Sequence, residues 1–355
     1  MRVVVKIGSS SLTDDAGRIT VEAIDKLCSE VAHSRAGGHE IVVVTSGAIA
    51  AGLPALGMAS RPRDALTLQA LSAVGQSRLL GVYNEALASH GLVAGQVLIS
   101  PHDFFERTQY LHAKATLARL LELGVVPVIN ENDALADTEI RFGDNDRIAA
   151  LVAQLIGADV LVLLTDTDGV FTADPRKDRE ASLIEEIIEV DRALEAAAGG
   201  AGSDRGSGGM ATKLAAARIA AWSGVRTVIA AARRPGVLAD AIAGTAGVGT
   251  IVQPRSRRLP ARKLWIAFAL VPEGLVTVDQ GARQALESRG TSLLPVGVLA
   301  VQGSFGVGSA VEVAGPDGSV FAKGLVRVGD GDLRALCGKR GPGEVIHRDE
   351  LVLVP

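Results

Sequence analysis

The sequence has few side chains that bind metals or form disulfides. It contains two cysteines, Cys28 and Cys337, which lie far apart and form no CxxC pair. Its six histidines are scattered along the chain rather than clustered. These absences argue against a structural zinc site and against a disulfide framework.

The sequence also lacks a continuous apolar run that could cross a membrane. Two uncharged stretches, residues 41–60 and 290–311, are broken by glycine and proline, so we expect strands and loops there. No signal peptide fits, because Lys6 interrupts the apolar run at the N-terminus. The formal net charge of −4 gives no sign of attraction to nucleic acid or to a membrane. We therefore expect a cytoplasmic protein with no membrane association.

The composition provides enough apolar material for a sizeable core. Apolar residues make up 48% of the 355 residues and charged residues 21%, which predicts a folded chain rather than a disordered one. This length suits one large domain followed by a small one.

In the first part of the chain, short runs of valine, isoleucine and leucine alternate with segments of helical periodicity. The strand-like runs are residues 3–7, 41–44, 96–99, 125–129, 160–164 and 227–230. The helical segments include residues 21–31, 109–123, 145–156 and 212–222. Because continuous apolar strands are typical of a sheet buried on both faces, this alternation predicts an α/β domain with a mainly parallel sheet.

The pattern changes near residue 255. Basic residues and Pro260 crowd residues 255–263, a composition that we interpret as a linker. Later in the chain, short β-like runs are separated by glycine and aspartate, with one helical piece at residues 279–288. The predicted organisation is a large domain at residues 1–254, a linker at 255–272 and a small β-rich domain at 273–355.

Lys6 lies in the first motif that could contact phosphate. It stands near a strand end and is followed by Gly8, Ser9 and Ser10, which could set a cation and N–H groups beside an anion. The alternative is a strand that ends in an ordinary turn. However, a buried lysine needs an anionic partner.

A glycine-rich loop at residues 206–209 runs into an expected helix that carries Lys213 in its first turn. Such a loop can cradle phosphate at a helix N-terminus, although no Walker A pattern is present. The alternative is a flexible linker. Because a lysine is electrostatically unfavourable at a helix start, we favour the phosphate interpretation.

Acidic and amide residues gather at two further places. Residues 130–133 (Asn-Glu-Asn-Asp) follow a strand, and residues 144–146 (Asp-Asn-Asp) begin a helix. Helix capping or a solvated loop would explain single residues of this kind. Ligands of open α/β sheets bind at the carboxyl ends of strands, which favours a functional interpretation of residues 130–133.

Two more polar segments also follow strands. A segment such as residues 165–169 (Thr-Asp-Thr-Asp-Gly) most often forms an ordinary turn. Ser46 lies in a Thr-Ser-Gly-Ala segment that lacks the GxSxG frame of a nucleophile, so we interpret it as a ligand-contacting hydroxyl.

The chain carries these motifs in the order KIGSS, VVTSGAIAAG, PVINENDA, GDND, LLTDTDGVFTADP and GGMATK. No single motif is specific, but the ordered set resembles the amino acid kinase family over most of residues 1–253. The C-terminal part is similar to the PUA domain that bacterial members carry. The resemblance implies a three-layer α/β/α sandwich around a mainly parallel sheet, followed by a small β-rich, PUA-like barrel.

The resemblance also implies a role for each candidate site residue. Lys6 and Lys213 would lie on the phosphates, and Asp146 would hold both lysines in position. Ser46, Asp133 and Asn145 would bind the substrate. The residues expected to contact ATP are Lys6, Gly8, Ser9, Thr165, Asp166, Ser207, Gly208, Gly209, Met210, Ala211, Thr212 and Lys213.

The implied reaction is Mg²⁺-dependent transfer of phosphate from ATP to the side-chain carboxylate of L-glutamate, the first step of proline biosynthesis. That carboxylate has a pKa of about 4.3 and is already ionised at neutral pH, so it can attack without a general base. Such a site needs aligned positive charge rather than histidine or cysteine. The family further implies feedback inhibition by L-proline at a loop around residues 52–58, and we expect a homo-oligomer, either a dimer or a tetramer.

Two alternatives stay open. The acceptor could be another acid used within the family, such as aspartate or acetylglutamate. The PUA-like domain could bind RNA, but residues 273–355 contain ten acidic and eight basic residues and only two aromatic ones, Phe305 and Phe321. Since these are too few for a stacking platform, we expect no RNA binding and a structural or oligomer-organising role for this domain.

Overall fold

The chain folds into two compact units, which are described separately. The computed structural model describes residues 1–14, 18–104, 106–135, 145–175, 178–191, 194, 209–256, 258–268, 270–341 and 343–354. The first unit is Met1–Arg258 and the second is Leu259–Pro355.

The first unit is built on an eight-stranded sheet in the order β3-β4-β2-β1-β5-β7-β8-β6. Its strands are β1 (Arg2–Ile7), β2 (Glu40–Val44), β3 (Ala94–Ile99), β4 (Val126–Glu131), β5 (Val160–Thr165), β6 (Glu186–Ile187), β7 (Arg226–Ala231) and β8 (Thr250–Val252). Every neighbouring pair is parallel except β7 and β8. The predicted mainly parallel sheet is therefore confirmed.

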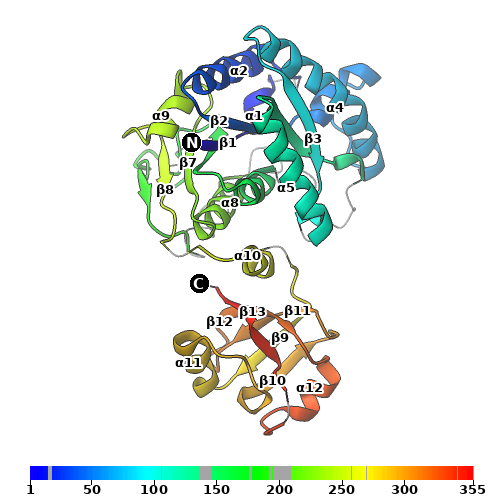
Figure 1. Ribbon diagram of the computed structural model, residues 1–355, viewed down its shortest axis with the longest axis vertical. Coiled ribbons are helices and arrows are strands. Elements are labelled where there is room, and N and C mark those ends of the chain that lie inside the picture. The colour runs from blue at the N-terminus through cyan, green and yellow to red at the C-terminus, as the bar shows by residue number, and fades with distance from the viewer. Residues whose placement is uncertain are drawn as a thin grey trace. The chain divides into compact units, whose positions relative to one another are not determined.

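Helices cover both faces of this sheet (Figure 1). One layer contains α2 (Val21–Ala36), α4 (Ala65–Ala88) and α9 (Val237–Ala243), and the other contains α5 (Arg107–Glu122), α6 (Asn145–Ile156) and α8 (Met210–Trp222). The shorter helices are α1 (Ser9–Leu12), α3 (Ala48–Gly52), η1 (Pro54–Leu56), η2 (Pro101–Phe104) and η3 (Asp133–Leu135). The three-layer α/β/α sandwich implied by the resemblance is confirmed.

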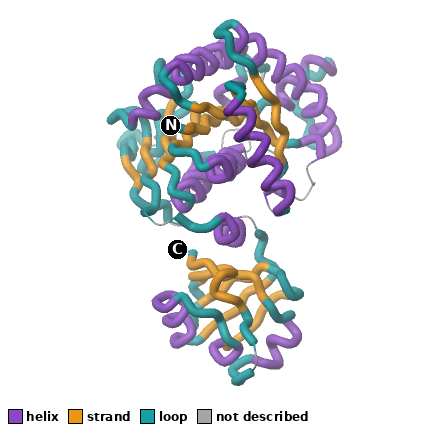
Figure 2. The backbone as a smooth tube through the Cα atoms, viewed as in Figure 1, coloured by secondary structure: helices purple, strands orange, loops and turns teal. Residues whose placement is uncertain are grey.

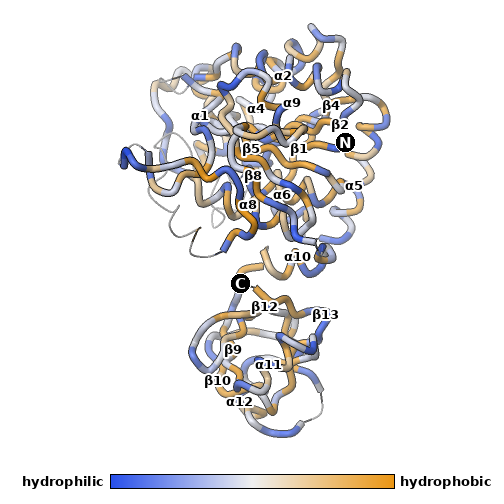
Figure 3. The backbone as a smooth tube through the Cα atoms, turned by 90° about the vertical axis from the view of Figure 1, so that its left-hand side faces the viewer, coloured by the Kyte–Doolittle hydropathy of each residue, from blue (hydrophilic) through white to orange (hydrophobic). Residues whose placement is uncertain are grey.

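Strand β1 shows how the sequence sets the site. Side chains alternate between the two faces of a strand, and Val3, Val5 and Ile7 pack into the core beneath α2, α4 and α9. Lys6 consequently points to the opposite layer, where α6 and α8 lie. Hydrophobic residues dominate the central strands β1 and β5 (Figure 3). Lys6 is therefore a buried charge within an apolar part of β1.

Helix α4, which spans 24 residues, packs unusually close to α3. A Cβ atom at Gly75 would lie 1.8 Å from the carbonyl oxygen of Ala48, and one at Gly52 would lie 2.2 Å from the carbonyl oxygen of Leu71. Glycine is therefore required on both sides of this contact. It fixes α4 against the segment that directly follows Ser46.

The second unit contains a five-stranded sheet in the order β10-β9-β11-β12-β13 (Figure 2). Its elements are α10 (Ala261–Phe268), β9 (Gly274–Val278), α11 (Gln280–Arg289), η4 (Pro295–Gly297), β10 (Val298–Gly303), β11 (Ala310–Ala314), β12 (Val320–Val326), α12 (Asp330–Leu336) and β13 (Ile346–Leu353). Strands β9 and β11 are parallel, and the other neighbours are antiparallel. Alternate residues such as Val276, Val278, Val311 and Val313 fill its separate core.

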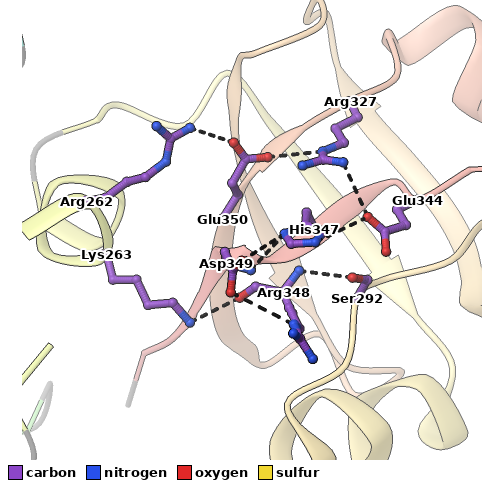
Figure 4. Close-up of polar contacts among 9 residues, drawn as sticks. All are labelled: Arg262, Lys263, Ser292, Arg327, Glu344, His347, Arg348, Asp349 and Glu350. Atoms are coloured by element: carbon purple, nitrogen blue, oxygen red, sulfur yellow. Dashed lines mark hydrogen bonds and ion pairs between the residues drawn. The ribbon is translucent and has the colours of Figure 1, made fainter. Parts of the chain in front are cut away.

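Helix α10 lies within the segment predicted to be a linker, yet it belongs to the second unit and is joined to the rest of that unit by polar contacts (Figure 4). Arg262 and Arg327 bind the two carboxylate oxygens of Glu350 at 2.6 and 3.2 Å. Lys263 donates a hydrogen bond to the carbonyl oxygen of Arg348 at 3.1 Å. Part of the basic cluster therefore holds this helix against β13.

Across the described parts of both units, no helix combines the length and apolarity needed to span a membrane.

We predict opposite effects for two glycine-to-alanine substitutions on helix α4. Gly75→Ala should lower the free energy of unfolding by about 2 kcal/mol or more, because its Cβ would collide with the backbone of α3. Gly81→Ala is the matched control, since no atom of the residues that the structure describes lies within 4 Å of the added Cβ. It should raise stability by about 0.5–1 kcal/mol through helix propensity. Urea unfolding measures both, and equal effects would contradict the close packing of α3 and α4.

Candidate active site

The candidate residues gather at one edge of the large sheet. Because β1, β2, β4 and β5 are parallel, their carboxyl ends lie on the same side. Lys6 and Gly8 come from the end of β1, Ser46 follows β2, and Asn130 belongs to β4. Lys6 is opposite Val44 of β2 and Leu163 of β5 in the strand register, which places it near the middle of this edge.

Two lysines share one carboxylate at this edge. The Nζ atom of Lys6 lies 2.7 Å from Oδ1 of Asp146, and that of Lys213 lies 3.2 Å from Oδ2. Thr212 donates a further hydrogen bond to Oδ2 at 3.0 Å. The three charged residues are only 1–5% exposed. They come from β1, α6 and α8, so one buried ionic cluster joins three elements of the fold.

Opposing effects set the protonation of Asp146. Burial would raise the pKa of its carboxyl group, but the charges of Lys6 and Lys213 and the hydrogen bonds from Lys6 and Thr212 outweigh burial and lower the pKa to about 2. The carboxylate is therefore ionised at neutral pH. Two ammonium groups and one carboxylate together carry one net positive charge, an arrangement suited to an anion.

A chain of buried polar side chains lies beside this cluster. Nδ2 of Asn145 donates hydrogen bonds to Oγ of Ser46 at 3.0 Å and to Oδ1 of Asn130 at 3.2 Å. Nδ2 of Asn130 donates to Oε1 of Gln76 at 2.7 Å. Oδ1 of Asn145 is buried and has no hydrogen-bond partner among the described residues.

Asp133 is also buried, close to helix α4. Its Oδ2 accepts a hydrogen bond from Ser72 at 3.1 Å, whereas its Oδ1 has no partner in the described part of the chain. Burial raises the pKa of Asp133, and the hydrogen bond from Ser72 and the charge of Arg61 oppose that rise only in part. Asp133 thus retains an unsatisfied acceptor in a desolvated place, which favours binding of a cationic group.

Two of the residues expected to contact nucleotide, Thr165 and Asp166, lie at the end of β5, on the other side of β1 from Ser46. Thr165 ends β5 and its hydroxyl donates to Oδ1 of Asp166 at 3.1 Å, while Arg233 donates to the carbonyl oxygen of Asp166 at 2.8 Å. Gly8 precedes α1, and a Cβ there would lie 3.4 Å from Nζ of Lys6.

Helix α8 begins beside the lysine cluster. Gly209 is its N-cap, and its first turn contains Met210, Ala211 and Thr212 but no acidic residue. An anion is therefore favoured at this terminus. Ser9 begins α1. The predicted residues Ser207 and Gly208 lie outside the described residues.

The structure thus brings Lys6, Lys213 and Asp146 into direct contact, and separately joins Ser46 to Asn145. Among the described residues, Asp133 is bonded to neither group and accepts its hydrogen bond from Ser72. Sequence reasoning missed Ser72 and Gln76, because it did not recognise α4. Their spacing of four residues was the available signal, since it places both on one face of a helix.

Comparison with known proteins agrees with this architecture. The model of the amino acid kinase family matches residues 1–231, and that of the PUA domain matches residues 274–343. The chain belongs to the amino acid kinase family.

Relatives that align over almost the whole chain are glutamate 5-kinases. A glutamate 5-kinase from Pelobacter propionicus is 45% identical over 364 aligned positions, which cover 99% of this chain and 97% of that protein. The glutamate 5-kinase from Burkholderia multivorans is 47% identical, with coverage of 99% and 98%. The carbamate kinase from Giardia lamblia bound to AMP-PNP shares the fold at a TM-score of 0.52, with 16% identity over 72% of this chain and 98% of that chain.

We predict that Asp146 stabilises the family fold in a pH-dependent way. Its pKa falls from 3.8 to about 2 on folding, so its stabilisation is present above pH 3.8 and is lost as the pH falls toward 2. Asp146→Asn should lower the free energy of unfolding near neutral pH. The difference from the unsubstituted chain should then narrow by about 2 kcal/mol between about pH 4 and pH 2. Urea titrations across this range measure the difference, and one that stays constant would contradict the prediction.

Proposed function

We propose that this chain transfers the γ-phosphoryl group of ATP to the side-chain carboxylate of L-glutamate. The products are L-glutamyl 5-phosphate and ADP, and the reaction is the first step of proline biosynthesis. Relatives named glutamate 5-kinase, 45–47% identical over 99% of the chain, support this substrate.

The observation that carries the proposal is the order of the site residues along the sheet edge. Ser46 and Asn130 lie at the β2 and β4 side, Lys6 lies at the central β1, and Thr165 lies at β5. This order supports an amino acid at one side, a nucleotide at the other, and phosphoryl transfer between them at Lys6. An in-line displacement requires this linear arrangement of acceptor, phosphoryl group and leaving group.

The chemistry needs positive charge and alignment rather than a base. The glutamate carboxylate is already ionised at neutral pH, so no proton must be removed before it attacks. Lys6 and Lys213 bind the phosphoryl oxygens and neutralise the charge that develops during transfer. Asp146 is a positioning residue, because its low pKa and its contacts with both lysines leave it unsuited to accept a proton.

Recognition of the amino acid needs acceptors for its α-ammonium group. Oδ1 of Asp133 and Oδ1 of Asn145 are buried acceptors with no partner among the described residues. A protonated amine satisfies such oxygens, and a site built in this way rejects analogues that lack it. These two oxygens therefore support an amino acid rather than a simple dicarboxylic acid as the acceptor.

The site residues also fit ATP accompanied by Mg²⁺. The start of α8, from Gly209 to Lys213, and the end of β1 offer N–H groups and ammonium groups to the phosphates. No cluster of three histidine, cysteine or acidic residues occurs in the described parts of the chain. Bound with ATP, Mg²⁺ would neutralise charge on the phosphates.

Two further properties belong to the proposal through the family resemblance. The first is feedback inhibition by L-proline at residues 52–58, a segment that overlaps α3 and η1 beside helix α4. The second is assembly into a homo-oligomer, either a dimer or a tetramer.

The substrate is tested by trapping the product. With ATP, Mg²⁺ and hydroxylamine, glutamate should yield a coloured hydroxamate, because hydroxylamine captures an acyl phosphate. Aspartate and acetylglutamate are the matched alternatives and should yield none. Turnover of either alternative without turnover of glutamate would overturn the substrate assignment.

The lysine cluster is tested by Lys213→Ala. We expect kcat to fall by at least about 10²-fold, the scale for losing one preorganised contact with developing charge. Lys114→Ala, in an exposed part of α5, is the matched control and should leave kcat unchanged. A normal kcat in Lys213→Ala would contradict the phosphate-binding role and favour the alternative that the glycine-rich loop is a flexible linker.

A further inference from the structure

Helix α4 carries two buried polar side chains that the reaction itself does not use. Ser72 and Gln76 are 2% and 8% exposed, and the same helix buries Leu68, Leu71 and Leu79 in the core. Polar groups in such a place cost free energy unless they are hydrogen-bonded. Within the described part of the chain, Ser72 is bonded to Asp133 and Gln76 to Asn130, and both partners belong to the amino-acid side of the site.

Gln76 acts on Asn130, whose amide can adopt only one orientation. The backbone N–H of Glu131 donates to Oδ1 of Asn130 at 2.9 Å, and a backbone N–H can only donate. The other end of that amide must therefore be Nδ2, which donates to Oε1 of Gln76 at 2.7 Å. Gln76 and the backbone together fix the Asn130 amide at both ends.

The orientation of Asn130 determines that of Asn145. Because Oδ1 of Asn130 is an acceptor, Asn145 must present Nδ2 to it, at 3.2 Å. The same Nδ2 also donates to Ser46 at 3.0 Å. Oδ1 of Asn145 then has no partner among the described residues and is left as a buried acceptor.

Ser72 has the same effect on Asp133, one helical turn earlier. Its hydroxyl donates to Oδ2 of Asp133 at 3.1 Å, which leaves Oδ1 buried and without a partner in the described residues. The contact of Gly75 with Ala48 holds α4 against the segment after Ser46, so both side chains act from a fixed helix.

We propose that Ser72 and Gln76 are positioning residues that fix the two acceptor oxygens of Asp133 and Asn145 for the α-ammonium group of the substrate. They set the preference for an amino acid over the dicarboxylic acid that lacks the amine. This inference rests on the proposed function. Neither residue touches the reacting carboxylate, so the two act on amino-acid binding and not on phosphoryl transfer.

The test uses Gln76→Met and Ser72→Ala in the full chain. Gln76→Met keeps the length of the side chain but removes the acceptor, and it should raise KM for glutamate about tenfold. Ser72→Ala should raise KM for glutamate about fivefold. In both variants, kcat and KM for ATP should stay within about twofold, because the lysine cluster is untouched.

Inhibition by glutarate distinguishes a role in binding the α-ammonium group from a general structural role. It is glutamate without the α-ammonium group, so its inhibition constant against glutamate should change less than about twofold in either variant. Ser77→Ala is the matched control on α4, since the exposed Ser77, among the described residues, bonds to its own helix at Val74. It should change none of these constants.

The outcomes separate the two claims. If the unsubstituted chain does not turn over glutamate, the proposed function is wrong and this inference falls with it. If the unsubstituted chain is active, two results overturn the inference alone: an unchanged KM for glutamate, or an equal weakening of glutamate and glutarate. Should Gln76→Met fail to fold, as judged by circular dichroism, Ser72→Ala decides by the same two criteria.

Discussion

The pairing of Asp146 with Lys6 and Lys213 is the interaction on which the rest of the catalytic unit depends. Two ammonium groups repel each other, and burying them without an anionic partner costs free energy. One carboxylate held at 2.7 and 3.2 Å satisfies both. It leaves one net positive charge among the three groups, at the sheet edge where β1 ends and α8 begins. The arrangement that stabilises the buried lysines is therefore the one that prepares the site for phosphate.

The start of helix α6 joins this cluster to the amino-acid side of the site. Asn145 and Asp146 are neighbours in sequence, yet Asn145 binds Ser46 after β2, whereas Asp146 binds Lys6 of β1 and Lys213 of α8. Successive residues at the start of a helix point in different directions, so a single turn can serve both halves of the site. Acceptor and phosphoryl group are thereby aligned by one rigid element, which is how positioning contributes to catalysis.

The sequence predicted the sheet and much of the candidate site, for identifiable reasons. Continuous apolar runs such as residues 3–5 of β1 have a strong pattern, and Lys6 stands out because it interrupts one. Helix α4 has little amphipathic contrast, since its polar and apolar residues are spread around the helix without a clear polar face. Ser72 and Gln76 were therefore missed, because their roles depend on partners far away in sequence, Asp133 and Asn130.

A double-mutant cycle on kcat shows whether Asp146 and the two lysines act as one unit. If Asp146 works by holding the lysines, then Asp146→Asn and Lys213→Ala remove parts of one unit. Their combined loss in kcat should then be smaller than the product of the two single losses by at least about tenfold. A combined loss equal to that product, within about twofold, would show that the residues act independently and would contradict the account.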